Sequence, residues 1–171
     1  MVGKVKKEKS ILGQISDLSH RLVLMLVFPI IISLVLMLFY ASKYHSSISR
    51  MGTIAGLKTM VSEEIPGAAW NIVSGRETIE ESGIYISIHS VNDTIQEITD
   101  RTGQENRLSL IVASRTMQTL ENYVDRIKEN IEADEPVVKN EEVLEEVRDV
   151  AALVDSMLNE YIAQEIESTA R

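Results

Sequence analysis

The longest apolar stretch of the chain runs from Leu22 to Tyr40 and contains no charged residue. An uncharged stretch of this length spans the ~30 Å hydrocarbon core of a bilayer as a helix. Pro29 is compatible with that helix, because membrane helices tolerate a proline as a kink. The pattern therefore predicts a short N-terminal segment at 1–21, a transmembrane helix at 22–41 and one domain at 42–171.

Beyond this run, four stretches repeat hydrophobic residues at alternating steps of three and four, which is typical of helices that bury one stripe. The first stretch is the weakest, because Lys58 falls on its stripe. The stripes of the other three are Ile84, Ile88, Val91, Ile95 and Ile98; Leu110, Ala113, Met117, Leu120, Val124, Ile127 and Ile131; and Leu144, Val147, Ala151, Val154, Leu158 and Tyr161. We predict helices at about 43–65, 79–101, 105–132 and 141–168.

These helices predict an all-α chain, in which the transmembrane helix precedes an up-down-up-down four-helix bundle. Residues 83–88 also alternate with a period of two, as a short strand would. The helical period continues for another ten residues while the alternation stops, so a helix is the better interpretation there.

Helix-breaking and capping residues fall between the four stretches. Pro66-Gly67 predicts the end of the first helix. A capping side chain followed closely by acidic residues predicts a helix start. Such starts are Thr78 with Glu81, Thr102 with Glu105, and Asn140 with Glu141 and Glu142.

The charges on the two sides of the apolar run differ in sign. Of the 17 basic and 26 acidic residues, five basic and two acidic residues precede the run. The other 12 basic and 24 acidic residues follow it. Short basic segments stay on the cytoplasmic side of a membrane. We therefore expect residues 1–21 in the cytoplasm and the residues after about 42 outside the cell membrane. The net charge of −12 after the run argues against nucleic acid as a partner.

Two features bear on processing and on the extent of the protein. A cleaved signal peptide would have a shorter apolar region and a small-x-small cleavage site, so an uncleaved anchor fits the run better. The fourth predicted helix returns toward the bilayer and is still amphipathic at Glu165-Ile166-Glu167. We expect a second span beyond Arg171, which would make this chain the front part of a longer protein.

The sequence contains no recognisable catalytic constellation. It has no cysteine, and His20, His45 and His89 are widely separated. No zinc-binding His-Glu-x-x-His pattern and no glycine-rich phosphate loop occurs. We expect no enzymatic activity, no cofactor and no metal site in these 171 residues.

One irregular segment, 70–76, could bind a ligand or a partner protein at the far tip of the bundle. It holds the only tryptophan, a glycine and an arginine that could pair with a carboxylate or phosphate. The candidate site residues are Trp70, Asn71, Ser74 and Arg76. In the other interpretation, which the segment favours, Trp70, Ile72 and Val73 close the far end of the core and Arg76 pairs with a nearby acid.

Three runs resemble the sensor regions of membrane histidine kinases of the two-component type from Gram-positive bacteria. They are IVSGR at 72–76, RTMQTLENYVDRI at 115–127 and YIAQEI at 161–166. The resemblance implies an extracellular helical sensor that works as a homodimer in the lipid bilayer and responds to a small molecule or a protein. In that family a second span, a HAMP relay and a kinase core follow, and none of them lies in this chain.

Two other functions fit the same pattern. Chemoreceptors share the helical sensor architecture, and a single-pass protein could use its helices as a scaffold or interaction module. The coding sequence after Arg171 distinguishes the three interpretations. A second span and a kinase core would support the sensor kinase, a methylated coiled coil the chemoreceptor, and a stop codon the scaffold protein.

Overall fold

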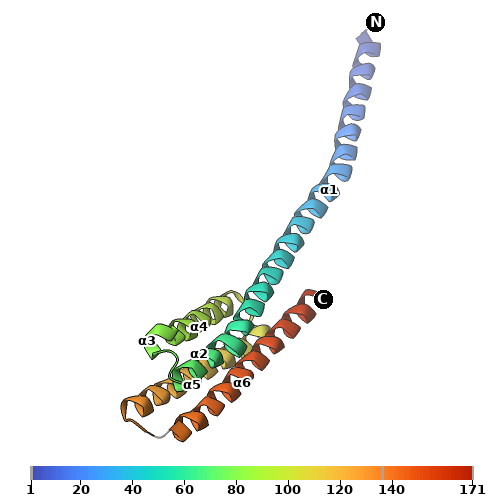
Figure 1. Ribbon diagram of the computed structural model, residues 1–171. Helices are drawn as coiled ribbons and strands as arrows, with labels where there is room; N and C mark the ends of the chain where they lie inside the picture. Colours follow the sequence, from blue (N-terminus) through green and yellow to red (C-terminus); the bar gives the residue numbers. More distant parts are fainter. Residues whose placement is uncertain (1, 136, 171) are drawn as a thin grey trace. The chain divides into compact units, whose positions relative to one another are not determined.

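The computed structural model describes residues 2–135 and 137–170, and side chains from residue 21 onward apart from 136–138 (Figure 1). Every described element is helical, and no strand occurs in these ranges. The elements are α1 (Val2–Thr59), the π-helical turn η1 (Met60–Glu64), α2 (Ile65–Val73), α3 (Ile79–Ser82), α4 (Ile84–Arg101), the 3-10 turn η2 (Gln104–Asn106), α5 (Arg107–Glu132) and α6 (Val137–Ala170). The chain divides into two compact units, Met1–Ser46 and Ser47–Arg171. The prediction of an all-helical chain is confirmed.

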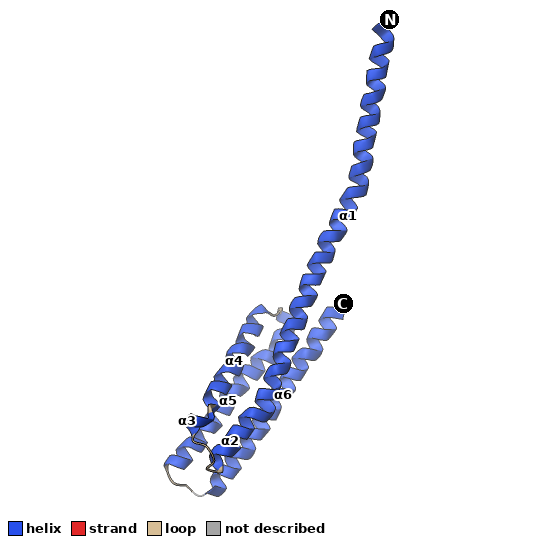
Figure 2. Cartoon of the chain, turned by 45° about the horizontal axis from the view of Figure 1, so that its top comes forward, coloured by secondary structure: helices blue, strands red, loops and turns tan. Residues whose placement is uncertain are grey.

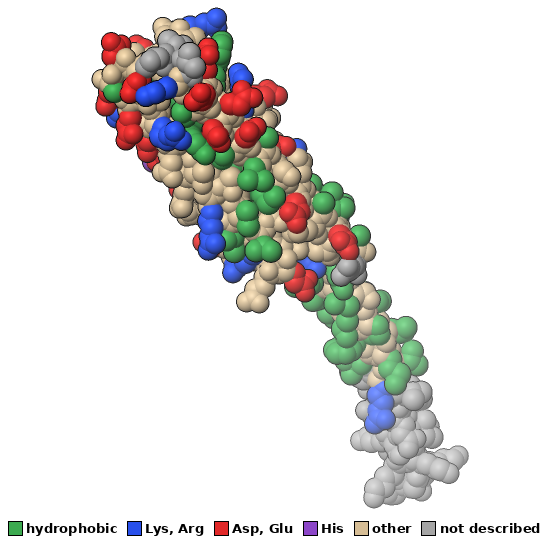
Figure 3. All heavy atoms as spheres, turned by 90° about the horizontal axis from the view of Figure 1, so that it is seen from below, with side chains coloured by type: hydrophobic (Ala, Val, Ile, Leu, Met, Phe, Trp, Pro, Cys, Tyr) green, Lys and Arg blue, Asp and Glu red, His purple; other side chains and the backbone are tan. Residues whose placement is uncertain are grey.

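The apolar run of the first unit lies within α1, and the helix continues through Pro29. Its large apolar side chains are exposed, from 43% at Ile32 to 78% at Met25, and they form a continuous apolar surface (Figure 3). By length and composition this is one helix able to cross a membrane, and none of its most apolar stretch is buried.

The second unit, here called the helical domain, packs its helices side by side around one core (Figures 1 and 2). The most extensive contacts join α5 to α6, followed by α4 with α5 and α2 with α6. The three predicted stripes on α4, α5 and α6 are buried throughout, except at Ile131, which is 44% exposed. Ile131 lies in the last turn of α5 and borders a cavity described below.

The first predicted helix continues beyond the expected break at Pro66-Gly67. The chain stays helical to Val73, because Pro66 occupies the first turn of α2, where its missing N–H costs no hydrogen bond. The wider π-helical turn η1 precedes it. Val61 within this turn and Ile65 directly after it are both fully buried.

The capping prediction at Thr78 and Glu81 is confirmed. The Glu81 backbone N–H donates to Thr78 Oγ1 at 3.3 Å, and the Thr78 N–H donates to Glu81 Oε2 at 3.1 Å. The helix that starts there is interrupted at Gly83, which adopts a left-handed conformation with φ +63° between α3 and α4.

The other two capping predictions are wrong. Thr102 ends α4 rather than starting α5, and its Oγ1 donates to the Ile98 carbonyl at 2.7 Å. Asn140 lies inside α6, which begins at Val137, and it is only 6% exposed. Asn140 precedes Leu144 by four residues and therefore falls on the buried stripe of that helix.

Candidate functional site

The predicted site segment contributes to one end of the helical domain. Its first residues complete α2, and a loop over 74–78 leads to α3. The Asn71 carbonyl accepts the N–H of Arg76 at 2.9 Å, and Gly75 takes φ +69°, so the chain turns sharply after the helix. This turn fixes the position of the loop.

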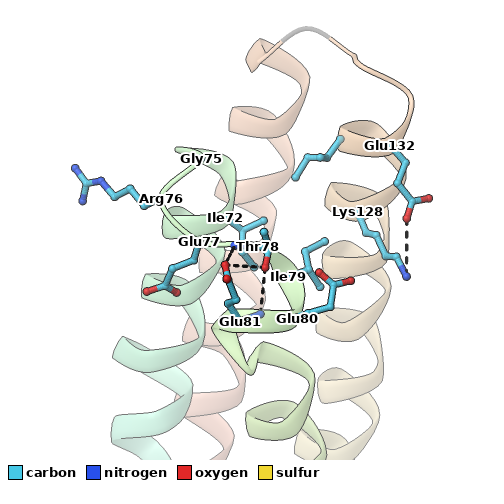
Figure 4. A pocket seen from close by; sticks show the side chains of 11 residues that line it. Ile72, Gly75, Arg76, Glu77, Thr78, Ile79, Glu80, Glu81, Lys128 and Glu132 are labelled. Carbon is cyan, nitrogen blue, oxygen red and sulfur yellow. Dashed lines mark hydrogen bonds and ion pairs between the residues drawn. The ribbon is translucent and has the colours of Figure 1, made fainter.

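The four predicted site residues do not converge on one site in the structure. Trp70 is 41% exposed and does not close the core; the Arg148 guanidinium lies over its ring at 5.9 Å. Ser74 Oγ donates to the Asn71 carbonyl at 3.1 Å. Arg76 is exposed and points away from the neighbouring cavity (Figure 4), and it forms no ion pair within the described chain. Of the four, only Arg76 borders that cavity.

The cavity lies between this loop, α3 and the last turns of α5, and has a volume of about 470 Å³. Ile72, Ile79 and Ile131 supply its apolar surface. Figure 4 shows Ile79 and Glu80 on the side that faces α5, where Lys128 and Glu132 lie. The cavity is therefore an open pocket with an apolar floor and a charged rim.

The charges at the rim are only partly paired. Lys128 Nζ lies 4.0 Å from Glu132 Oε1, one helical turn along α5. Hydrogen bonds from the backbone and side chain of Thr78 lower the pKa of Glu81 below its ordinary value. Glu80 has no ion pair or side-chain hydrogen bond within the described residues. Sequence reasoning missed Lys128 and Glu132, because nothing local in α5 signals that they meet the loop.

A second polar site, here called the Glu165 cluster, lies at the opposite end of the helical domain. It consists of Ser47 and Arg50 of α1, Asn106 of η2, and Tyr161 and Glu165 of α6. Glu165 is only 3% exposed. Its carboxylate accepts hydrogen bonds from Ser47 Oγ at 2.8 Å, from Asn106 Nδ2 at 3.1 Å and from the Arg50 guanidinium.

Tyr161 extends the cluster by one helical turn. Its hydroxyl accepts from Arg50 Nε at 3.2 Å and lies 3.4 Å from Thr102 Oγ1, at the end of α4. Burial alone would raise the pKa of Glu165, but the hydrogen bonds from Arg50, Ser47 and Asn106 outweigh it. The pKa therefore lies below its ordinary value, and the carboxylate is ionised at neutral pH.

This arrangement connects helices and carries no recognisable catalytic geometry. The donors to the Glu165 carboxylate come from α1 and η2, and Glu165 itself lies on α6, so one buried charge links three elements. Among the described side chains, no group of three or more His, Asp or Glu residues could hold a metal ion.

His89 pairs with Glu121 at 2.9 Å on an exposed surface.

Comparisons with known proteins found no match to the chain, whether with protein-family models, with curated proteins or with solved structures.

Proposed function

We propose that this chain is the sensor and transmembrane signalling region of a two-component histidine kinase. In this proposal the apolar run anchors the chain in the cell membrane, residues 1–21 are cytoplasmic, and the helical domain is outside. The domain works as an up-down-up-down four-helix bundle within a homodimer. The bundle has four helical segments. The first is the part of α1 after Ser47 together with η1 and α2, the second is α3 together with α4, and the third and fourth are α5 and α6.

The observation that carries the proposal is the Glu165 cluster. It fixes the last turns of α6 to Ser47 and Arg50, which follow the apolar run within the same helix α1. A stimulus that shifts α6 therefore has to break or move this contact. Such a shift requires two packings of similar free energy, and a stimulus can favour one of them only by its difference in affinity.

The orientation can be tested on the intact chain, because it contains no native cysteine. We expect a Glu97→Cys variant to react with a membrane-impermeant maleimide in intact cells, since Glu97 is exposed. A Ser10→Cys variant should react only after the cells are permeabilised. The reverse labelling pattern, or recovery of the chain without detergent, would contradict the proposal.

Signalling can be tested in a chimera that joins residues 1–171 to the second span and kinase core of a histidine kinase. We expect Glu165→Gln to change the basal autophosphorylation rate, because it removes the charge that links α6 to α1. The matched control is Glu97→Gln, which removes an exposed carboxylate whose one ion pair among the described residues is with Arg101. Equal rates for both variants and the unaltered chimera would contradict the proposed coupling.

A further inference from the structure

We propose that the cavity beside the 74–78 loop binds a linear aliphatic diamine or polyamine. The methylene chain would lie on Ile72, Ile79 and Ile131, and the ammonium groups would pair with Glu80 and Glu132. That this ligand acts as a stimulus rests on the proposed sensor function, but its binding can be measured separately.

The size and floor of the cavity fit a short aliphatic chain. A volume of about 470 Å³ lies within the range of small-molecule sites. Ile131 is 44% exposed although it continues the buried stripe of α5, so it offers apolar surface that no side chain of the described protein covers. Ile72 is 4% exposed and forms the back of the cavity. A methylene chain would remove this apolar surface from water.

The rim favours a cation over an anion for two independent reasons. First, α2 ends at Val73 and α5 ends at Glu132, so the negative ends of two helix dipoles border the cavity. Second, Glu80 is an exposed carboxylate without a described partner, and it faces α5 in Figure 4. The one helix that starts here, α3, has only four residues and already carries Glu80 and Glu81 in its first turn.

The two basic residues at the cavity do not reverse this preference. Arg76 points away from the cavity (Figure 4), which argues against a carboxylate or phosphate ligand held by Arg76 inside it. Lys128 lies at the rim and reaches Glu132 only at 4.0 Å, with 44% of its side chain exposed. An ammonium group of the ligand would compete with Lys128 for Glu132.

Ligand binding can be measured by isothermal titration calorimetry on the intact chain in lipid nanodiscs. The probe is 1,6-diaminohexane, and the controls of matched length are 1,6-hexanediol and adipate. We expect the diamine to bind, the diol to bind at least tenfold more weakly and adipate not to bind. Diamine affinity should also fall as the salt concentration rises. Equal binding of the diol, or no binding of the diamine, would overturn the inference.

Matched variants test which residues hold the ligand. Glu80→Gln and Glu132→Gln should each weaken diamine binding about fivefold, which corresponds to the loss of one partly exposed ion pair. Lys128→Met should strengthen it, because it removes the competing cation. Glu97→Gln, away from the cavity, should leave it unchanged. Unchanged affinity in both cavity glutamine variants would overturn the inference, whereas the proposed sensor function depends on the separate labelling and autophosphorylation results.

Discussion

Ser47 Oγ donates a 2.8 Å hydrogen bond to the carboxylate of Glu165, although the two residues are 118 positions apart in the sequence. The same carboxylate is bound by Arg50, so two consecutive turns of α1 hold one turn of α6. A buried carboxylate costs free energy unless its acceptor positions are filled. The donors therefore determine both the stability of this end of the domain and the position of α6.

Removing Arg50 should destabilise the helical domain. An Arg50→Ala variant leaves the Glu165 carboxylate, whose side chain is 5% exposed, without its cationic partner. We expect the free energy of unfolding to fall by about 2–4 kcal/mol. The measurement is urea unfolding of the chain in detergent, monitored by circular dichroism.

The control for this variant is Arg101→Ala. Arg101 pairs with Glu97 at 2.7 Å, but both side chains are more than half exposed. Exposed pairs contribute little, so the loss should stay below about 0.5 kcal/mol. Similar losses in the two variants would show that burial of the Glu165 carboxylate is unimportant.

The Glu165 cluster should also make the domain sensitive to acid. Because the folded pKa of Glu165 lies below its unfolded value, its contribution to stability is fully present above the unfolded pKa. It is lost below the unfolded pKa of about 4.3, as the pH falls through the folded pKa. A Glu165→Gln variant should be less stable at neutral pH and lose less stability in acid. Urea unfolding at several pH values measures both slopes, and parallel slopes would contradict the assignment.

The sequence predicted well those features that depend on local periodicity. The stripes on α4, α5 and α6 are buried as expected, apart from Ile131, and the capping box at Thr78 and Glu81 forms. Both depend on residues within a few positions of one another. Pro66 misled the prediction, because whether a proline ends a helix or sits in the first turn of the next one depends on the neighbouring turn η1.

The two polar sites depend on contacts between distant segments. Lys128 and Glu132 meet the 74–78 loop only because α5 ends beside it, and sequence spacing carries no sign of that contact. Glu165 did leave a signal: it follows Leu158 and Tyr161 at steps of three and four, so a carboxylate occupies a position on the buried stripe. Such a position requires donors from other helices.

Asn140 offers a site where a substitution should stabilise the domain. It is 6% exposed, and its Oδ1 has no hydrogen-bond partner among the residues that the structure describes. An unsatisfied buried acceptor costs about 1–3 kcal/mol. Asn140→Leu keeps the branched shape and removes that cost, so we expect a gain of about 1 kcal/mol in the free energy of unfolding. Asn122→Leu, on the exposed face of α5, is the control and should change little. A loss of stability in Asn140→Leu would indicate that Oδ1 is satisfied in solution.

Gly83 separates α3 from α4 and should be needed for its backbone conformation alone. It has φ +63°, and an added Cβ would meet no atom within 4 Å. Gly83→Ala should therefore cost about 1 kcal/mol through backbone strain and not through a clash. Gly103 is the matched control, because its added Cβ is equally unhindered but its φ is −61°. Gly103→Ala should leave the free energy of unfolding unchanged or raise it slightly, since it restricts only the unfolded chain. Urea unfolding of both variants measures the difference, and equal effects would show that α3 and α4 do not require a left-handed residue between them.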